Sequence, residues 1–319
     1  MLSKSSKIYI AGHRGMVGSA IWRALEAKGY HQLIGKSSKE LDLRNQQAVM
    51  SFFQNERPDV VIDAAARVGG ILANNDYPYQ FLMENMLIQN NLIDGAHKND
   101  AASFVFLGSS CIYPKLAPQP LKEEYLLTSS LEPTNEWYAL AKISGVKACE
   151  AIRKQFNKNF VSLMPTNLYG PYDNFDLQTS HVLPAMLRKF HEAKENGHAP
   201  VKLWGSGTPM REFLHVDDVA EAVVFALENK LPDNLYNIGT GVDLTIKELA
   251  ALIQQTVGHQ GDLIWDSEKP DGTPRKLMDV SKMAAAGWTY KIPLEEGIVS
   301  TYQWFLNNVD QVKEVKMDI

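Results

Sequence analysis

Residues 8–18 read I-Y-I-A-G-H-R-G-M-V-G, and this stretch decides the fold. The apolar run Ile8–Ala11 is typical of a buried strand, and the helical spacing of Ile21 and Leu25 predicts a helix after it. The turn between them has the pattern G-x-x-G-x-x-G, at Gly12, Gly15 and Gly18. Glycine allows a tight turn, close approach of backbone N–H groups to a pyrophosphate, and close packing of helix on strand. An ordinary glycine-rich turn is the alternative, but its place at the first strand–helix junction favours a dinucleotide site.

The alternation of short apolar runs and amphipathic stretches continues through the first half of the chain. Further strands are predicted at residues 32–34, 60–63, 103–107 and 160–164. Helices are predicted at residues 17–28, 46–55, 79–99 and 136–156. This order is typical of a parallel sheet covered by helices on both faces, so we expect an α/β fold with a doubly wound, Rossmann-type sheet.

The second half of the chain has more turns, and helices are predicted there at residues 181–196, 216–228 and 245–257. Because 319 residues are more than one hydrophobic core usually serves, we expect a second, smaller α+β lobe that binds substrate. The helix at 216–228 resembles those of the first half, so the lobes are expected to interleave. The predicted division is 1–175 with 214–238 for the dinucleotide lobe, and 176–213 with 239–319 for the substrate lobe.

The composition excludes several classes of protein. There are 32 Lys and Arg against 37 Asp and Glu, a net charge of -5, so no broad basic surface exists for a nucleic-acid partner. Two cysteines, Cys111 and Cys149, are too few for a disulfide framework or a cysteine-rich zinc site, so we expect no metal and a reducing cytoplasm. Residues 1–7 do not predict a signal peptide, and no apolar run approaches the roughly 18 residues of a membrane span.

The end of the second predicted strand indicates which dinucleotide is used. An acidic residue usually accepts the ribose 2′-hydroxyl of NAD there, but residues 35–38 read G-K-S-S. Lys36, together with Arg14 of the glycine turn, could instead hold a 2′-phosphate, and we therefore expect NADP(H). The alternative is that both side chains are solvated surface charges.

Three residues predict a proton donor next to this cofactor. Tyr138 and Lys142 are four residues apart and share one helix face, so the ammonium can lie near the phenol. A nearby cation favours phenolate and is expected to lower the pKa of Tyr138 toward neutrality. Ser109 follows the strand predicted at 103–107, where ligands meet a doubly wound sheet, and could hydrogen-bond a substrate oxygen.

With this order of glycine turn, serine, tyrosine and lysine, the sequence resembles the extended short-chain dehydrogenase/reductase superfamily. Residues 211–218, R-E-F-L-H-V-D-D, match a late motif of that superfamily, and the resemblance covers nearly the whole chain. It implies a homodimer formed through the helices at 79–99 and 136–156. The apolar positions of these helices fit burial within one subunit equally well.

Within the superfamily, residues 108–115, 133–142, 164–172 and 204–218 resemble the bifunctional 3,5-epimerase/4-reductases that act on GDP-4-keto-6-deoxy-D-mannose. The dehydratases carry an acidic pair beside the catalytic serine or threonine, whereas Ser110 and Cys111 stand here, which disfavours loss of water. By resemblance, Cys111 and His181 exchange the protons on C3 and C5, and either could act at either carbon. Tyr138 then protonates the C4 oxygen, Lys142 tunes the tyrosine and Ser109 orients the ketone.

The resemblance also implies the binding residues. Those expected for NADP(H) are Gly12, His13, Arg14, Gly15, Met16, Val17, Gly18, Lys36, Leu107, Gly108, Ser109, Ser110, Lys142, Pro165, Thr166, Asn167, Leu168 and His181. Those expected for the GDP-sugar are Lys189, Trp204, Arg211, Asp271 and Arg275. Arginine's forked guanidinium suits a diphosphate at Arg211, whereas core packing is a competing explanation for Trp204.

Two rival functions remain from the sequence. A nucleotide-sugar 4-epimerase would use Ser109, Tyr138 and Lys142 but would not need Cys111 and His181 as a pair. A non-catalytic NADP-binding regulator would commonly have lost the tyrosine or the lysine, and both are present.

Overall fold

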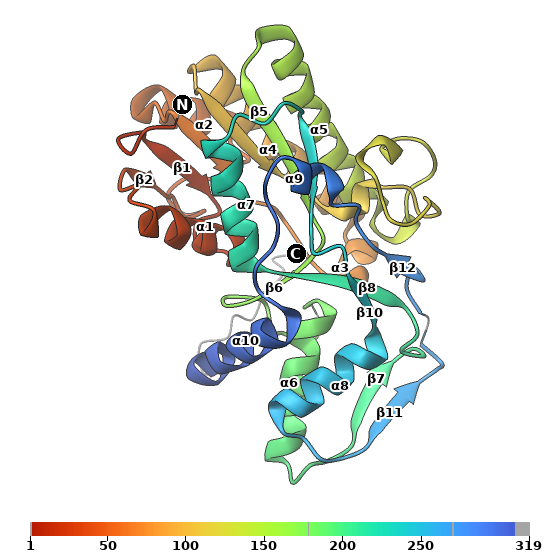
Figure 1. Cartoon of the computed structure of the whole chain (residues 1–319). Coiled ribbons are helices and arrows are strands. Elements are labelled where there is room, and N and C mark those ends of the chain that lie inside the picture. Colours follow the sequence, from red (N-terminus) through yellow and green to blue (C-terminus); the bar gives the residue numbers. More distant parts are fainter. Residues whose placement is uncertain (1, 178, 270, 310–319) are drawn as a thin grey trace.

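The computed structural model describes residues 2–177, 179–269 and 271–309 (Figure 1). Its larger lobe is built on a parallel sheet of six strands. Their order is β2 (Leu33–Ile34), β1 (Ile8–Ala11), β3 (Val60–Asp63), β4 (Ser103–Leu107), β5 (Asn159–Pro165) and β9 (Leu235–Ile238). The order reverses between β1 and β3, which is the switch point where such sheets bind ligands at their carboxyl ends. The predicted doubly wound α/β fold is confirmed.

Alternation along the strands supplies a core on each face of this sheet. Ile8 and Ile10 of β1 point to one face, while Tyr9 and Ala11 point to the other, and all four are fully buried. One core includes α1 (Met16–Ala27) and α7 (Val216–Glu228), which pack together. The opposite core includes α2 (Gln46–Glu56), α4 (Pro78–Lys98) and α5 (Glu136–Phe156).

Late segments of the chain return to the larger lobe. The strand β9 pairs with β5, and α7 lies between that strand and β8 in sequence. Met283 of α9 (Ser281–Ala285) and Trp288 also pack into the core beside α7. The short helix α3 (Ile71–Asp76) and the 3-10 turns η1 (Ser110–Ile112), η2 (Glu123–Tyr125) and η3 (Pro133–Asn135) complete this part of the chain.

The smaller lobe lies below the sheet in Figure 1 and has its own core. Leu187, Ile253 and Phe305 meet there, one from each of three helices. These helices are α6 (Val182–Glu195), α8 (Ile246–Val257) and α10 (Leu294–Asn308). A parallel pair of strands, β7 (Val201–Trp204) and β11 (Leu263–Asp266), flanks them.

A second sheet joins the two lobes. Its central strand is β8 (Met210–His215), which runs toward α7 in Figure 1. It pairs with β6 (Asn167–Tyr169) and β12 (Arg275–Lys276) in parallel and with β10 (Asp243–Thr245) antiparallel. Since β6 follows β5 directly, residues at the carboxyl end of the large sheet are brought against β8.

Candidate active site

The glycine turn after β1 has the geometry that its sequence predicts. Gly12 has φ +78°, and a Cβ at this position would lie 2.6 Å from the carbonyl oxygen of Ala64, so only glycine fits between β1 and β3. The Gly15 N–H donates to the Gly12 carbonyl (2.9 Å), and Gly15 begins α1 without a side-chain cap. The first N–H groups of α1 are therefore available to an anion. This cradle fits a pyrophosphate.

The loop after β2 holds a carboxylate that the sequence analysis missed. Glu40 accepts hydrogen bonds from the Ser37 backbone N–H (2.8 Å) and hydroxyl (2.5 Å). These bonds, with the positive charges of Lys36 and Arg14, lower the pKa of Glu40. Lys36 and Arg14 thus share this corner with an acid. The clue in the sequence was the spacing S-x-x-E, which commonly closes a local turn.

The serine, tyrosine and lysine of the predicted set meet at the end of β4. Lys142 is buried and its Nζ donates to the Leu107 carbonyl (2.9 Å), 5.8 Å from the ring centroid of Tyr138. Ser109 begins η1, and its hydroxyl accepts from the Cys111 backbone N–H (3.4 Å). Phe81 packs edge-on against Tyr138, with centroids 6.3 Å apart. The three polar side chains therefore surround one position beside the switch point.

The pKa of Tyr138 shifts in the direction opposite to the one predicted from the sequence. Burial raises the pKa of the Tyr138 hydroxyl, and Cys111 and Asp63 raise it further. Burial likewise lowers the pKa of Lys142, although Asp63 and Cys111 oppose the change. The expectation that Lys142 brings the tyrosine pKa toward neutrality is wrong for this state of the protein, because desolvation outweighs the cation. Tyr138 is held protonated, as a proton donor requires.

Asp63 is a buried carboxylate that no sequence pattern singled out. It ends β3 at 1% exposure, and one oxygen accepts the Ala65 N–H (3.1 Å). The other oxygen has no hydrogen-bond partner in the described part of the chain. Burial raises the Asp63 pKa to about 6, and Lys142 opposes this shift.

Cys111 and His181 come from separate elements. The Cys111 side chain is buried in η1, and burial raises its pKa while Lys276, Ser109 and Lys142 act in the opposite direction. His181 is exposed at the N-terminus of α6. Desolvation lowers the pKa of its imidazole, and Lys276 lowers it further. The Lys276 ammonium therefore acts on the pKa of both Cys111 and His181.

Lys276 was not predicted as a site residue. It belongs to β12 and lines a pocket together with Cys111. Burial lowers the pKa of its ammonium, with Cys111 and Glu132 opposing and Arg211 reinforcing the change. The remaining lining residues are Tyr113, Pro114, Lys115, Gln119, Leu121, Glu132, Thr273 and Arg275. The basic pair R-K at 275–276 was the available signal, but only its first residue was singled out.

Trp204 presents its indole to solvent. The side chain is 57% exposed, and the ammonium groups of Lys189 and Lys269 lie 5.9 and 5.5 Å from its ring centroid. Core packing, the competing explanation, is therefore wrong for this residue. Burial lowers the pKa of Lys189, as expected for a lysine held against protein.

The remaining predicted substrate residues have protein partners. Arg211 donates to the Met210 carbonyl (2.7 Å), and burial lowers its pKa while Asp271 opposes this. Asp271 accepts from the backbone N–H (2.9 Å) and hydroxyl (2.7 Å) of Ser206. Arg275 makes a bidentate pair with Asp243, at 2.6 and 3.0 Å. Asp271 and Arg275 therefore shape the walls around Arg211.

The segment 165–168 connects the cofactor side to β8. Thr166 and Asn167 both donate to the Glu212 carbonyl, at 3.3 and 2.8 Å, and Leu168 packs on the core beside α7. Leu107, Gly108 and Ser110 are buried at the end of β4, next to this segment in the sheet. These positions bring the predicted cofactor residues of β4 and β5 together.

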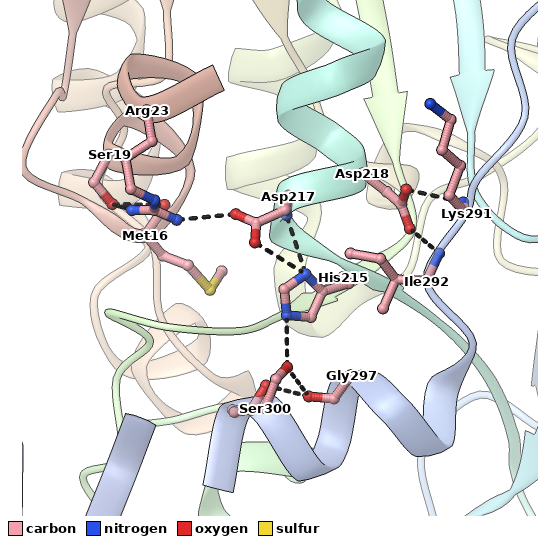
Figure 2. Close-up of polar contacts among 11 residues, drawn as sticks. Met16, Ser19, Arg23, His215, Asp217, Asp218, Lys291, Ile292, Gly297 and Ser300 are labelled. Carbon is pink, nitrogen blue, oxygen red and sulfur yellow. Dashed lines mark hydrogen bonds and ion pairs between the residues drawn. The ribbon is translucent and has the colours of Figure 1, made fainter. Parts of the chain in front are cut away.

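The late motif at 211–218 ties the helix α1 to residues 291–300 (Figure 2). His215 Nδ1 accepts the Asp217 backbone N–H (3.2 Å), and the Asp217 carboxylate accepts from Arg23 of α1 (2.9 Å). The Asp218 carboxylate accepts the backbone N–H groups of residues 291–292, at 2.9 and 3.0 Å. Burial lowers the pKa of His215, so its Nδ1 remains an acceptor. This network fixes α1 relative to β8 and α7.

Two searches of the described residues found nothing. No helix among them is long and apolar enough to cross a membrane. No group of three or more His, Cys, Asp or Glu side chains among them could hold a metal ion.

The chain was compared with known proteins. The model of the NAD dependent epimerase/dehydratase family matches residues 8–239. GDP-L-fucose synthase 1 of Arabidopsis thaliana is 57% identical over 309 residues, which cover 97% of this chain and 96% of that protein. GDP-L-fucose synthase of Escherichia coli (strain K12) is 54% identical over 316 residues, covering 96% of this chain and 98% of that one. The crystal structure of a GDP-L-fucose synthetase from Naegleria fowleri bound to NADP superposes with a TM-score of 0.88 at 26% identity, over 98% of each chain.

Proposed function

Because the chain belongs to the NAD dependent epimerase/dehydratase family, we propose that it converts GDP-4-keto-6-deoxy-D-mannose to GDP-L-fucose. It is an NADPH-dependent oxidoreductase that also epimerises C3 and C5. One observation carries this proposal: the thiol of Cys111 lies in the same site as the Tyr138 acid, and Ser109 accepts a hydrogen bond from the Cys111 backbone N–H. A base and a ketone-protonating acid thus meet one substrate.

Epimerisation needs a group that removes a proton and another that returns one from the opposite face. The 4-keto group acidifies the hydrogens on C3 and C5, so a thiolate at Cys111 can take a proton while the electron pair moves to the C4 oxygen. In its protonated form, which the lowered pKa of the imidazole disfavours before substrate binds, His181 returns a proton to carbon on the other face, and the ketone re-forms. Cys111 comes from η1 and His181 from the start of α6, so the two groups are carried by separate elements.

Reduction then uses the cluster at the end of β4. When bound, NADPH supplies a hydride to C4. Tyr138 gives its hydroxyl proton to the C4 oxygen, and Ser109 orients that oxygen by a hydrogen bond. Lys142 is the ammonium that faces the tyrosine ring, and we assign it to the ribose next to the nicotinamide.

The residues around the glycine turn fit NADP(H). The pyrophosphate is assigned to backbone N–H groups of residues 12–18, in the turn that the positive φ of Gly12 allows. Lys36 and Arg14 hold the 2′-phosphate, against the opposing charge of Glu40. We assign the nicotinamide end to residues 107–110 and 165–168 and to His181.

The GDP-sugar is assigned to the face between β8 and the smaller lobe. Arg211 pairs with the diphosphate, for which a guanidinium fork is suited. Trp204, exposed and flanked by Lys189, offers a flat surface for a guanine ring. Asp271 and Arg275 complete the set, and Arg275 lines the pocket that contains Cys111.

The same proposal covers the organisation of the protein. Residues 1–175 with 214–238 form the NADP lobe and 176–213 with 239–319 the GDP-sugar lobe, apart from the α9 region that packs back on the former. Two subunits pair through α4 and α5, whose Tyr79 and Trp137 are 69% and 42% exposed. Both cysteines are free thiols, which supports a reducing cytoplasm.

The proposal is tested by incubating the enzyme with GDP-4-keto-6-deoxy-D-mannose and NADPH in D2O. We expect NADPH oxidation and GDP-L-fucose that carries deuterium at C3 and C5. A reaction without NADPH is the control, in which the ketone should exchange deuterium without being reduced. Reduced product with no deuterium at either carbon would exclude the epimerase and favour the 4-epimerase type of chemistry. Absence of both turnover and exchange would favour a non-catalytic NADP-binding regulator.

A further inference from the structure

The strand that carries Lys276 is tied directly to the loop that follows Cys111. The Leu277 backbone N–H donates to the side-chain oxygen of Gln119 (2.9 Å), and the Leu277 carbonyl accepts the Leu121 N–H (2.7 Å). Lys276 and Cys111 line the same pocket. The backbone of β12 is therefore fixed relative to the loop between η1 and η2.

A buried carboxylate fixes the same strand from its other side. Glu212 is fully buried in β8, and one of its oxygens accepts the Met278 N–H (2.9 Å). The other oxygen accepts the N–H groups of Thr240 (2.6 Å) and Gly241 (2.8 Å). Because β12 also pairs with β8 in a register that aligns Lys276 with Arg211, Lys276 cannot shift without breaking this network.

The charged groups around Cys111 can be assigned element by element. Lys276 faces it from β12, and Lys142 and Tyr138 face it from α5. Lys142 donates to the Leu107 carbonyl. In the described part of the chain the Lys276 ammonium has no hydrogen bond or ion pair. Lys276 is therefore the cation near Cys111 without a hydrogen-bond partner among the described residues, and its effect on the thiol exceeds that of Lys142.

Lys276 is in turn faced by a small set of charges. Arg211 repels its ammonium, and Glu132 attracts it from the far wall of the pocket. Glu132 is committed elsewhere, since it pairs with Lys115 at 3.0 Å. His181 is the other titratable group near Lys276, and it feels the same positive charge. The Cys111 sulfur is the remaining group that can carry a negative charge next to Lys276.

We propose that Lys276 is a positioning residue that stabilises the thiolate of Cys111 when this thiol ionises to remove a proton from the substrate. The inference rests on the proposed function, and it adds a residue to the epimerase half of the site. The Cys111 proton leaves to solvent when the thiol ionises, and the ammonium of Lys276 then balances the sulfur's charge. After proton abstraction the sulfur is a neutral thiol and the negative charge has moved to the enolate oxygen, still within the field of Lys276.

The ion pair is tested without substrate by the pH dependence of Cys111 alkylation. Iodoacetamide reacts with the thiolate, and mass spectrometry of the peptides separates Cys111 from the buried Cys149. We expect Lys276→Met to move the midpoint of Cys111 alkylation upward by about one pH unit or more, and Lys276→Arg to keep it near the wild-type value. Lys276→Gln is a second variant that keeps a polar side chain if the methionine variant folds poorly.

Lys115→Met is the matched control, because Lys115 lines the same pocket but is paired with Glu132. Its alkylation midpoint should stay at the wild-type value. An unchanged midpoint in both Lys276→Met and Lys276→Gln would overturn the proposal, as would an equal shift in Lys115→Met. A raised KM for the GDP-sugar with an unmoved midpoint would place Lys276 on the diphosphate instead and also overturn it.

A second readout links the ion pair to the reaction. The pH profile of deuterium exchange at C3 and C5 should move upward in Lys276→Met by the same amount as the alkylation midpoint. Exchange that keeps the wild-type profile despite a shifted midpoint would contradict the assignment of this thiolate as the base. Because alkylation is measured without the GDP-sugar, failure of the proposed reaction is distinguishable from failure of the ion pair.

Discussion

The two chemical halves of the site are built in different ways. In the reducing half, Tyr138 and Lys142 share one face of α5, and Ser109 directly follows β4. In the epimerising half, Cys111 belongs to η1, His181 begins α6 and Lys276 lies on β12. The first half depends on the geometry of one helix and one strand, whereas the second depends on contacts between the two lobes.

The halves also differ in charge, in accordance with their tasks. The reducing half contains the buried carboxylate of Asp63 beside Lys142, and burial keeps Tyr138 protonated for donation. In the epimerising half, the positive charge of Lys276 acts on Cys111 and opposes the effect of burial, which raises the pKa of the thiol. Burial raises the pKa values of both Tyr138 and Cys111, so the tyrosine stays protonated, whereas the thiol depends on a neighbouring cation to ionise.

The largest expected effect separates the halves at Tyr138. Tyr138→Phe removes the proton donor to the C4 oxygen, and we expect reduction to fall about 10³-fold. Deuterium exchange at C3 and C5 and NADPH binding should persist, because neither uses the hydroxyl. Steady-state NADPH oxidation, mass spectrometry of the ketone and fluorescence titration of NADPH measure the three properties. Unchanged turnover would refute the role of Tyr138 as the acid.

A smaller effect concerns the buried acid of the reducing half. The Asp63 pKa of about 6 in the folded protein lies above its ordinary value of 3.8, so the folded state retains a proton that the unfolded chain releases. This contribution to stability is present at low pH and is lost as the pH rises through about 6. Relative to Asp63→Asn, the wild type should lose on the order of 3 kcal/mol between about pH 4 and about pH 7.5.

Urea unfolding of both proteins across this pH range measures the difference. The amide of Asp63→Asn keeps an oxygen for the Ala65 N–H, so local geometry is preserved. Parallel stability curves for the two proteins would show that Asp63 does not titrate in this range, and the contrast in charge between the halves would then be lost.

The smallest effect concerns the adenosine end of the cofactor. Lys36→Met removes one of the two cations that we assign to the 2′-phosphate, and we expect about fivefold weaker NADPH binding with NADH binding unchanged, because this corner is partly exposed to solvent. Glu40→Gln should act in the opposite direction, since it removes a charge that repels the phosphate. Titrations with each dinucleotide at matched ionic strength measure both. Equal weakening of NADPH and NADH by Lys36→Met would argue against this assignment.

The sequence predicted those parts of the molecule that depend on local order. The strand Ile8–Ala11 is apolar throughout and its glycines serve the turn, so β1 and the cradle follow from neighbouring residues. Tyr138 and Lys142 are brought together by helical periodicity alone. The strands β8 and β12 were not predicted. The residues of β8, M-R-E-F-L-H, neither alternate strictly nor form a long apolar run, β12 has only two residues, and their pairing joins distant segments.

Other residues were missed for related reasons. Asp63 is buried and Lys276 is half-buried, and burial by tertiary packing leaves no periodic signal in the sequence. Residues 35–38 contain no carboxylate, but a local turn brings the Glu40 side chain back onto the Ser37 N–H. The loop after β2 therefore has a negative charge that the sequence analysis did not expect. The exposure of Trp204 could not be predicted from the sequence either, because tryptophan is common in cores as well as on surfaces.

The central claim is that one site contains two separable chemistries, and Cys111→Ser tests it most directly. The variant is given GDP-4-keto-6-deoxy-D-mannose in D2O and, separately, the ketone that has already been epimerised, with NADPH. We predict that deuterium exchange at C3 and C5 falls by about 10² or more, whereas reduction of the epimerised ketone continues at close to the wild-type rate. Equal loss of both activities would contradict the assignment of Cys111 to proton transfer at carbon and with it the division of the site into two halves.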